Sequence, residues 1–200
     1  MGRRPRVPFE REFVHAYTRG NNRARVCLDE LDFVAWLRLL DRTVGLFGWR
    51  CHAYCLMPNH YHLLLETSQS DLSRGMRHLN GSFAQRLNKR YERTGHVFEG
   101  PYRIELVEAQ SHLLELCRYI PLNPVRAALV MRAEDWRLSS YRATAGLEHA
   151  PPFLTTSFVR SLFGRDSTAR RRYREFVGAG ERSHRAMSRD LVPGHGGLGR

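Results

Sequence analysis

The middle of the sequence holds two strand-like runs separated by a three-residue turn. The runs cover residues 49–56 and 60–66, and Met57-Pro58-Asn59 lies between them. Proline and asparagine between two apolar runs are typical of a tight turn, so the runs are predicted to pair as a hairpin. The chain is therefore expected to build on an antiparallel sheet.

The segments on either side of this hairpin follow recognisable periods. Residues 10–18 alternate in part and predict a strand. From Asp29 onward, apolar residues recur at helical spacing, and Asp29 is predicted to cap that helix. A second amphipathic helix is predicted over residues 72–91, with apolar residues on one face and basic residues on the other.

The last part of the predicted core contains a turn and a third helix. Residues 96–107 predict strand, turn and strand, and Ser111 is predicted to begin a helix that runs toward Tyr119. Asn123-Pro124 is predicted to end or kink this helix. The resulting order predicts an α+β fold: a ferredoxin-like antiparallel sheet with helices on one face, followed by the Tyr119 helix and a basic extension.

The charge balance indicates the class of partner. The chain has 32 lysines and arginines against 20 acidic residues, a formal net charge of +12, and Lys89 is its only lysine. Such an excess indicates a polyanion, most often nucleic acid. The alternative is a solvated basic surface, and a GC-rich genome would also favour arginine over lysine.

Two further features concern the compartment and the domain organisation. No apolar run approaches the ~20 residues that cross a bilayer, so we expect no membrane partner. Without a secretory h-region, and with four cysteines that suit free thiols, the chain is expected in the cytoplasm. We expect a catalytic domain over residues 9–146 and a basic extension over residues 147–200, disordered from about Gly178.

His60 and His62 form the first candidate site. Alternate residues of a strand share a face, so both imidazoles are predicted to point the same way and to be able to bind one divalent metal ion. One alternative is that they are polar residues on a half-exposed strand. Another is a structural zinc site that also uses Cys51 and Cys55, which are predicted to share one side of their strand.

Tyr119 and Asn123 form the second candidate site. They are one helical turn apart and are predicted to face the same way. A tyrosine can attack a phosphodiester, and an asparagine oxygen can be a third metal ligand beside two histidines. The alternative is a core aromatic and a helix-end residue. Pro121 lies between them and is predicted to bend this turn or to end the helix at the tyrosine.

Four stretches together carry a resemblance to a known family. They are residues 18–23 (Thr-Arg-Gly-Asn-Asn-Arg), 57–64 (Met-Pro-Asn-His-Tyr-His-Leu-Leu), 95–103 (Gly-His-Val-Phe-Glu-Gly-Pro-Tyr-Arg) and 119–127 (Tyr-Ile-Pro-Leu-Asn-Pro-Val-Arg-Ala). In this order they resemble the single-tyrosine HUH transposases, and most closely their REP-associated tyrosine branch. The likeness extends roughly from Phe13 to Gly146.

The resemblance implies a chemistry for these residues. His60, His62 and Asn123 would be ligands of Mg²⁺ or Mn²⁺, and Tyr119 would be the nucleophile. The family cuts single-stranded DNA that folds into hairpins, here REP-like sequences, and leaves a 5′-phosphotyrosine and a free 3′-hydroxyl that allow rejoining. The chain is therefore expected to be a metal-dependent DNA endonuclease and strand transferase of the prokaryotic nucleoid. We expect a monomer, with a dimer left open.

The DNA-contacting residues are inferred from charge and from nearness to the motifs. We expect backbone contacts from Arg19, Arg23, Arg74, Arg77, Arg86, Lys89, Arg90, Arg103 and Arg126. Two other functions stay open at this point. One is a catalytically silent regulator that binds hairpins or single strands, and the other is a small zinc-binding module.

Overall fold

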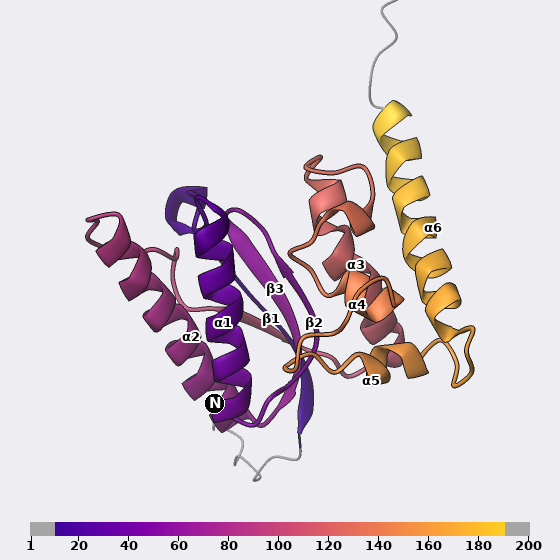
Figure 1. Ribbon diagram of the computed structural model, residues 1–200, viewed down its shortest axis with the longest axis horizontal. Coiled ribbons are helices and arrows are strands. Elements are labelled where there is room, and N and C mark those ends of the chain that lie inside the picture. Colours follow the sequence, from indigo (N-terminus) through magenta and orange to yellow (C-terminus); the bar gives the residue numbers. More distant parts are fainter. Residues whose placement is uncertain (1–10, 191–200) are drawn as a thin grey trace, which may run out of the picture.

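The fold is organised around a four-stranded antiparallel sheet (Figure 1). The computed structural model describes residues 11–190, with side chains described as far as His184. The strands are β1 (Glu12–Arg19), β2 (Arg50–Leu56), β3 (His60–Thr67) and β4 (Arg103–Leu106), in the spatial order β2-β3-β1-β4. The predicted β2–β3 hairpin is confirmed, and the Met57 amide donates to the carbonyl of His60 across its turn.

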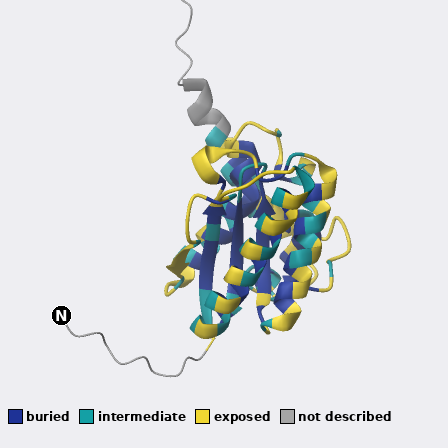
Figure 2. Cartoon of the chain, turned by 90° about the vertical axis from the view of Figure 1, so that its left-hand side faces the viewer, coloured by how far each residue is buried: buried dark blue, intermediate teal, exposed yellow. Residues whose placement is uncertain are grey.

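Two long helices cover one face of the sheet. Helix α1 (Glu30–Leu46) begins at the predicted cap, where the Asp29 side chain accepts a hydrogen bond from the Asp32 amide. Helix α2 (Gln69–Arg90) begins a little earlier than predicted and is capped by Ser68. Their apolar faces pack on the sheet, and Figure 2 shows the dark blue buried strands behind helices whose outward residues are yellow. No described helix is long and apolar enough to cross a membrane.

The opposite face of the sheet carries a second helical layer. It consists of α3 (Gln110–Arg126), α4 (Tyr141–Ala145), α5 (Thr156–Ser161) and α6 (Ala169–Asp190). The described residues also form two short 3-10 turns, η1 (Asn21–Arg23) and η2 (Ala133–Asp135). The sequence predicted helices on one face, which describes α1 and α2. The layer with α3 lies on the other side of the sheet (Figure 1). In the predicted strand–turn–strand segment, only β4 is a full strand, and Phe98 makes a single bridge to Gly20.

Helix α3 continues past both of its prolines to Arg126, so the predicted end at Asn123-Pro124 is wrong. A proline leaves the carbonyl four residues earlier without its helical partner. For Pro121 that carbonyl belongs to Cys117, and it accepts a hydrogen bond from the Tyr173 hydroxyl at 3.4 Å. For Pro124 it belongs to Ile120, and it accepts one from the Asn123 side chain at 3.2 Å. The helix continues because other groups supply the missing donors.

Helix α6 corrects the expectation of disorder from about Gly178. The helix continues to Asp190, and residues 191–200 lie outside the described part of the chain. Tyr173 and Val177 are buried in the same apolar cluster as α3. The Glu181 carboxylate accepts a hydrogen bond from the Ala133 amide at 2.7 Å. The basic extension therefore packs on the core through its apolar face, and the domain boundary after Gly146 stays a prediction.

Candidate active site

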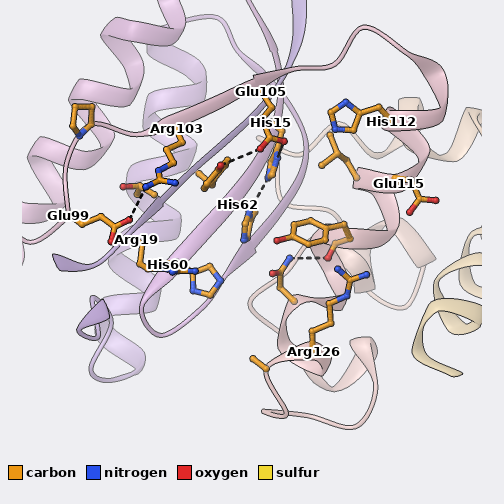
Figure 3. Close-up of a pocket in the computed structure, with 17 residues that line it drawn as sticks. His15, Arg19, His60, His62, Glu99, Arg103, Glu105, His112, Glu115 and Arg126 are labelled. Atoms are coloured by element: carbon orange, nitrogen blue, oxygen red, sulfur yellow. Dashed lines mark hydrogen bonds and ion pairs between the residues drawn. The ribbon is translucent and has the colours of Figure 1, made fainter. Parts of the chain in front are cut away.

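A pocket of about 790 Å³ lies between one end of the sheet and helix α3 (Figure 3). Its sheet wall follows from register, because antiparallel pairing sets Tyr17 beside His62 and Arg19 beside His60. Alternate residues of β1, β3 and β4 therefore point into the pocket. The lining includes His15, Tyr17, Arg19, His60, His62, Arg103 and Glu105 from the strands and His112, Glu115, Tyr119, Asn123 and Arg126 from α3.

His60 and His62 share the pocket face of β3, as predicted. The Nδ1 atom of His60 lies 2.6 Å from Asn59 Oδ1, and the Nδ1 atom of His62 lies 2.9 Å from His15 Nε2. In both rings Nδ1 is engaged, which leaves Nε2 for another ligand. Burial lowers the pKa of His60 to about 4 and that of His62 still further, with positive Arg19 adding to both shifts. Neutral imidazoles are the form that binds metal ions.

Tyr119 and Asn123 enter the pocket from α3. The Tyr119 ring meets the His62 ring edge to face, with centroids 5.4 Å apart. The guanidinium of Arg126 lies 5.0 Å from the centroid of the Tyr119 ring. The side-chain nitrogen of Asn123 donates to the carbonyls of Tyr119 and Ile120, so its oxygen is the atom left for coordination. The helix does not end at Tyr119, and both residues face the pocket.

The donor set fits a divalent metal ion. It offers two imidazole nitrogens and one amide oxygen, a set suited to Mn²⁺ and of modest affinity for Mg²⁺. Among the His, Cys, Asp and Glu side chains of residues 11–184, no group of three or more could hold a metal. A three-ligand site at His60 and His62 therefore depends on Asn123.

The structure overturns the zinc alternative. A β-bulge shifts the register between Cys51 and Ala53, so the two cysteines do not share a face. Cys51 is buried in the core under α1 and α2, whereas Cys55 is buried in the core under α3. Burial also raises the pKa of the Cys51 thiol to about 12, which disfavours the thiolate that zinc binds. The prediction failed because an inserted residue reverses the alternation.

The predicted DNA-contacting residues fall into two groups. Arg19, Arg103 and Arg126 line the pocket. Arg23 lies outside its lining, on η1, where its carbonyl accepts a hydrogen bond from the Asn59 side chain. The others lie on α2, across the sheet from the pocket: Arg74, Arg77, Arg86, Lys89 and Arg90. Of these, Arg90 is held in ion pairs with the carboxylates of two α1-end residues, Asp29 and Asp32.

Several pocket residues could not be recognised from the sequence. On β1, Tyr17 pairs with His62 and His15 pairs with Leu64 of β3, and Glu105 of β4 pairs with His15. Glu105 accepts hydrogen bonds from the Tyr17 hydroxyl at 3.3 Å and from His15 Nδ1 at 3.2 Å. The alternation of residues 12–19 held the signal for His15, but only the strand register shows that it meets His62.

Comparison with known proteins agrees with this geometry. The sequence profile described as "Transposase IS200 like" matches residues 12–123, which include His60, His62, Tyr119 and Asn123. Comparison with curated proteins finds no match.

Among solved structures, one is that of a REP-associated tyrosine transposase bound to a REP hairpin. It is 14% identical, with a TM-score of 0.60 over 78% of this chain and 92% of that chain. Another, a proposed transposase of Deinococcus radiodurans R1, is 20% identical, with a TM-score of 0.43 over 60% of this chain and 95% of that chain. The first likeness establishes a shared fold. By the profile match over more than half of its length, the chain belongs to the IS200-like transposase family.

Proposed function

We propose that this transposase is a metal-dependent endonuclease and strand transferase that acts on single-stranded DNA. The observation that carries the proposal is the edge-on contact of Tyr119 with His62, in a pocket that also holds His60 and Asn123. A candidate nucleophile on a helix thus faces a candidate metal site on a strand. Elements packed in one core keep such groups at a fixed separation.

The proposed reaction is a transesterification at tyrosine. The Tyr119 hydroxyl oxygen attacks the scissile phosphorus and loses its proton, and the bond from phosphorus to the 3′ oxygen breaks. The 3′ oxygen takes up a proton and leaves as a free hydroxyl, while the 5′ side stays on Tyr119 as a phosphotyrosine. The ester bond is conserved, so attack by a 3′-hydroxyl reverses the step without ATP.

The surrounding residues have separate roles in this proposal. His60, His62 and Asn123 hold Mg²⁺ or Mn²⁺, which when bound neutralises charge that develops on the phosphate. Arg126, stacked over the Tyr119 ring, and Arg19 and Arg103 across the pocket contact the DNA backbone. Each of these side chains lies on an element whose position is fixed by the sheet or by α3.

The proposed substrate is a single strand that folds into a REP-like hairpin. The net charge of +12 and the arginines of the pocket support a DNA partner. The fold shared with a protein solved on a REP hairpin supports this kind of hairpin and the REP-associated branch. We further propose that the chain acts as a monomer at the nucleoid of a prokaryotic cytoplasm.

A covalent-adduct assay tests the proposed function. The protein is incubated with Mn²⁺ and a labelled single strand that contains a palindromic hairpin, and denaturing gels reveal any bound label. We expect an adduct that EDTA prevents and that Tyr119→Phe abolishes. Tyr102→Phe is the control, because the Tyr102 hydroxyl donates to Ser73 Oγ at 3.2 Å on α2, outside the pocket, and this variant should still form adduct.

The same assay separates the enzyme from a silent regulator. If the protein is a regulator, it should bind the hairpin but form no adduct on any hairpin strand, with or without Mn²⁺. An adduct that persists in Tyr119→Phe would refute the nucleophile assignment.

A further inference from the structure

A chain of hydrogen bonds connects strand β4 to the candidate metal ligand His62. The Glu105 carboxylate lies 3.2 Å from His15 Nδ1, and His15 Nε2 lies 2.9 Å from His62 Nδ1 (Figure 3). His15 is buried and its ring also stacks on His62, with centroids 5.2 Å apart. The three side chains come from three adjacent strands, so the sheet register fixes their order.

The direction of these hydrogen bonds follows from the acceptor at the end of the chain. A carboxylate only accepts, so His15 Nδ1 carries the proton that it shares with Glu105. A neutral imidazole has one N–H, which makes His15 Nε2 an acceptor. His62 Nδ1 must then be the donor, and the lone pair of His62 lies on Nε2.

Both rings are buried, and burial disfavours the charged imidazolium, so each ring carries a single proton. The other candidate ligand ring, His60, is fixed in the same way, because Asn59 Oδ1 accepts from His60 Nδ1. The two candidate ligands therefore present the same nitrogen, each held by a different neighbour.

We propose that His15 and Glu105 are positioning residues that hold His62 in the Nδ1–H tautomer and direct its Nε2 toward the divalent metal ion. The inference rests on the proposed metal site, but its first readout needs neither metal nor DNA. Outer-shell partners of metal-binding histidines typically contribute about 10–100-fold to metal affinity. Tyr17 supports the relay from the other side by donating to the second Glu105 oxygen at 3.3 Å.

The first test is the tautomer of His62 in the metal-free protein, read from the ¹⁵N shifts of its ring. Wild type should show a protonated Nδ1 and an unprotonated Nε2. His15→Phe keeps a ring to stack on His62 but offers no acceptor, and should give a mixture or the Nε2–H form. His15→Gln can accept from His62 through its amide oxygen and should restore the wild-type tautomer.

The second test is Mn²⁺ affinity, measured by electron paramagnetic resonance of free Mn²⁺ without DNA. His15→Phe should weaken binding by about 10–100-fold, and His15→Gln should recover most of that loss. Glu99→Gln is the matched control, since Glu99 lines the pocket and pairs with Arg103 rather than with a histidine. This control should bind Mn²⁺ as wild type does.

The outcomes separate this inference from the proposed function. An Nε2–H tautomer of His62 in wild type, or a His62 tautomer unchanged in His15→Phe, overturns the relay. Either result leaves the Tyr119 adduct assay to judge the reaction. If wild type forms no adduct but its His62 has the predicted tautomer, the relay is supported and only the proposed cleavage chemistry is refuted.

Discussion

The ring of Tyr119 meets the ring of His62 edge to face, with planes at 86° and centroids 5.4 Å apart. One residue belongs to α3 and the other to β3, so the packing of α3 on the sheet sets the distance between the candidate nucleophile and the candidate metal ligand. Side-chain donors bond the carbonyls that Pro121 and Pro124 leave without a helical partner. These hydrogen bonds stabilise α3 and therefore also help to position Tyr119.

Asn123→Ala should weaken Mn²⁺ binding by at least about tenfold, or about 1.4 kcal/mol. The reason is that Asn123 supplies the only proposed oxygen ligand. Asn123→Asp keeps an oxygen but loses the amide that donates to the Tyr119 and Ile120 carbonyls, so it should destabilise α3. Metal titration and urea unfolding measure the two effects. Unchanged metal affinity and unchanged metal-dependent cleavage in Asn123→Ala would remove it from the ligand set.

Tyr173→Phe should lower the free energy of unfolding by about 1–3 kcal/mol, because the buried Cys117 carbonyl loses its donor. In a Pro121→Ala background the loss should shrink, since the alanine amide can bond that carbonyl within the helix. A double-mutant cycle in urea measures the coupling. Equal losses in both backgrounds would show that the tyrosine hydroxyl does not compensate for the proline.

The pH dependence of stability should contain a contribution from His52. This ring is buried against Phe158, and burial lowers its pKa below 6.5 although Glu66 opposes the shift. Neutral His52 therefore favours the folded state above pH 6.5, and this stability is lost as the pH falls below 6.5 toward the folded-state pKa. One group contributes a slope of at most about 1.4 kcal/mol per pH unit.

His52→Gln should flatten the decline of the unfolding free energy between about pH 6.5 and 5. His96→Gln is the control, because His96 is exposed and its substitution should leave the slope as in wild type. Denaturant unfolding across this range gives the slope for each variant. A His52→Gln slope equal to that of wild type would mean that His52 titrates alike in the folded and unfolded states.

The pocket arginines should contribute more to DNA binding than those of α2. Arg103→Gln and Arg126→Gln should each reduce the slope of log affinity against log salt by about 1 for a hairpin strand. Arg77→Gln, on the α2 face, is the matched control and should keep the wild-type slope. Equal reductions for all three variants would mean that the DNA path also crosses the α2 face.

Local pattern was enough to predict most of the sheet and the first two helices. The Met57-Pro58-Asn59 turn and the Asp29 cap act through neighbouring residues, so they can be recognised in sequence. The position of the second helical layer could not be predicted, because α6 is placed by apolar residues that meet α3 only in the folded chain. The apolar positions of Tyr173 and Val177 are hard to recognise in the sequence, because Tyr173 is surrounded by Arg170, Arg171, Arg172 and Arg174.

The candidate site was predictable in part for the same reason. The spacings of His60 and His62, and of Tyr119 and Asn123, each fix a shared face, and the structure brings all four residues to one pocket. His15 and Glu105 join them only through strand register, which no local pattern reveals. The zinc alternative is wrong because a bulge after Cys51 puts Cys51 and Cys55 on opposite faces of the sheet. The residue types around Cys51 give no sign of this bulge.

The most direct measurement is the mass of the peptide that carries the DNA. Trypsin cuts after Arg118 and Arg126, so it releases residues 119–126, in which Tyr119 is the only hydroxyl-bearing residue. After reaction with a hairpin strand in Mn²⁺ and nuclease digestion, this peptide should carry a 5′-linked nucleotide on Tyr119. A nucleotide on any other peptide, with residues 119–126 unmodified, would contradict the account.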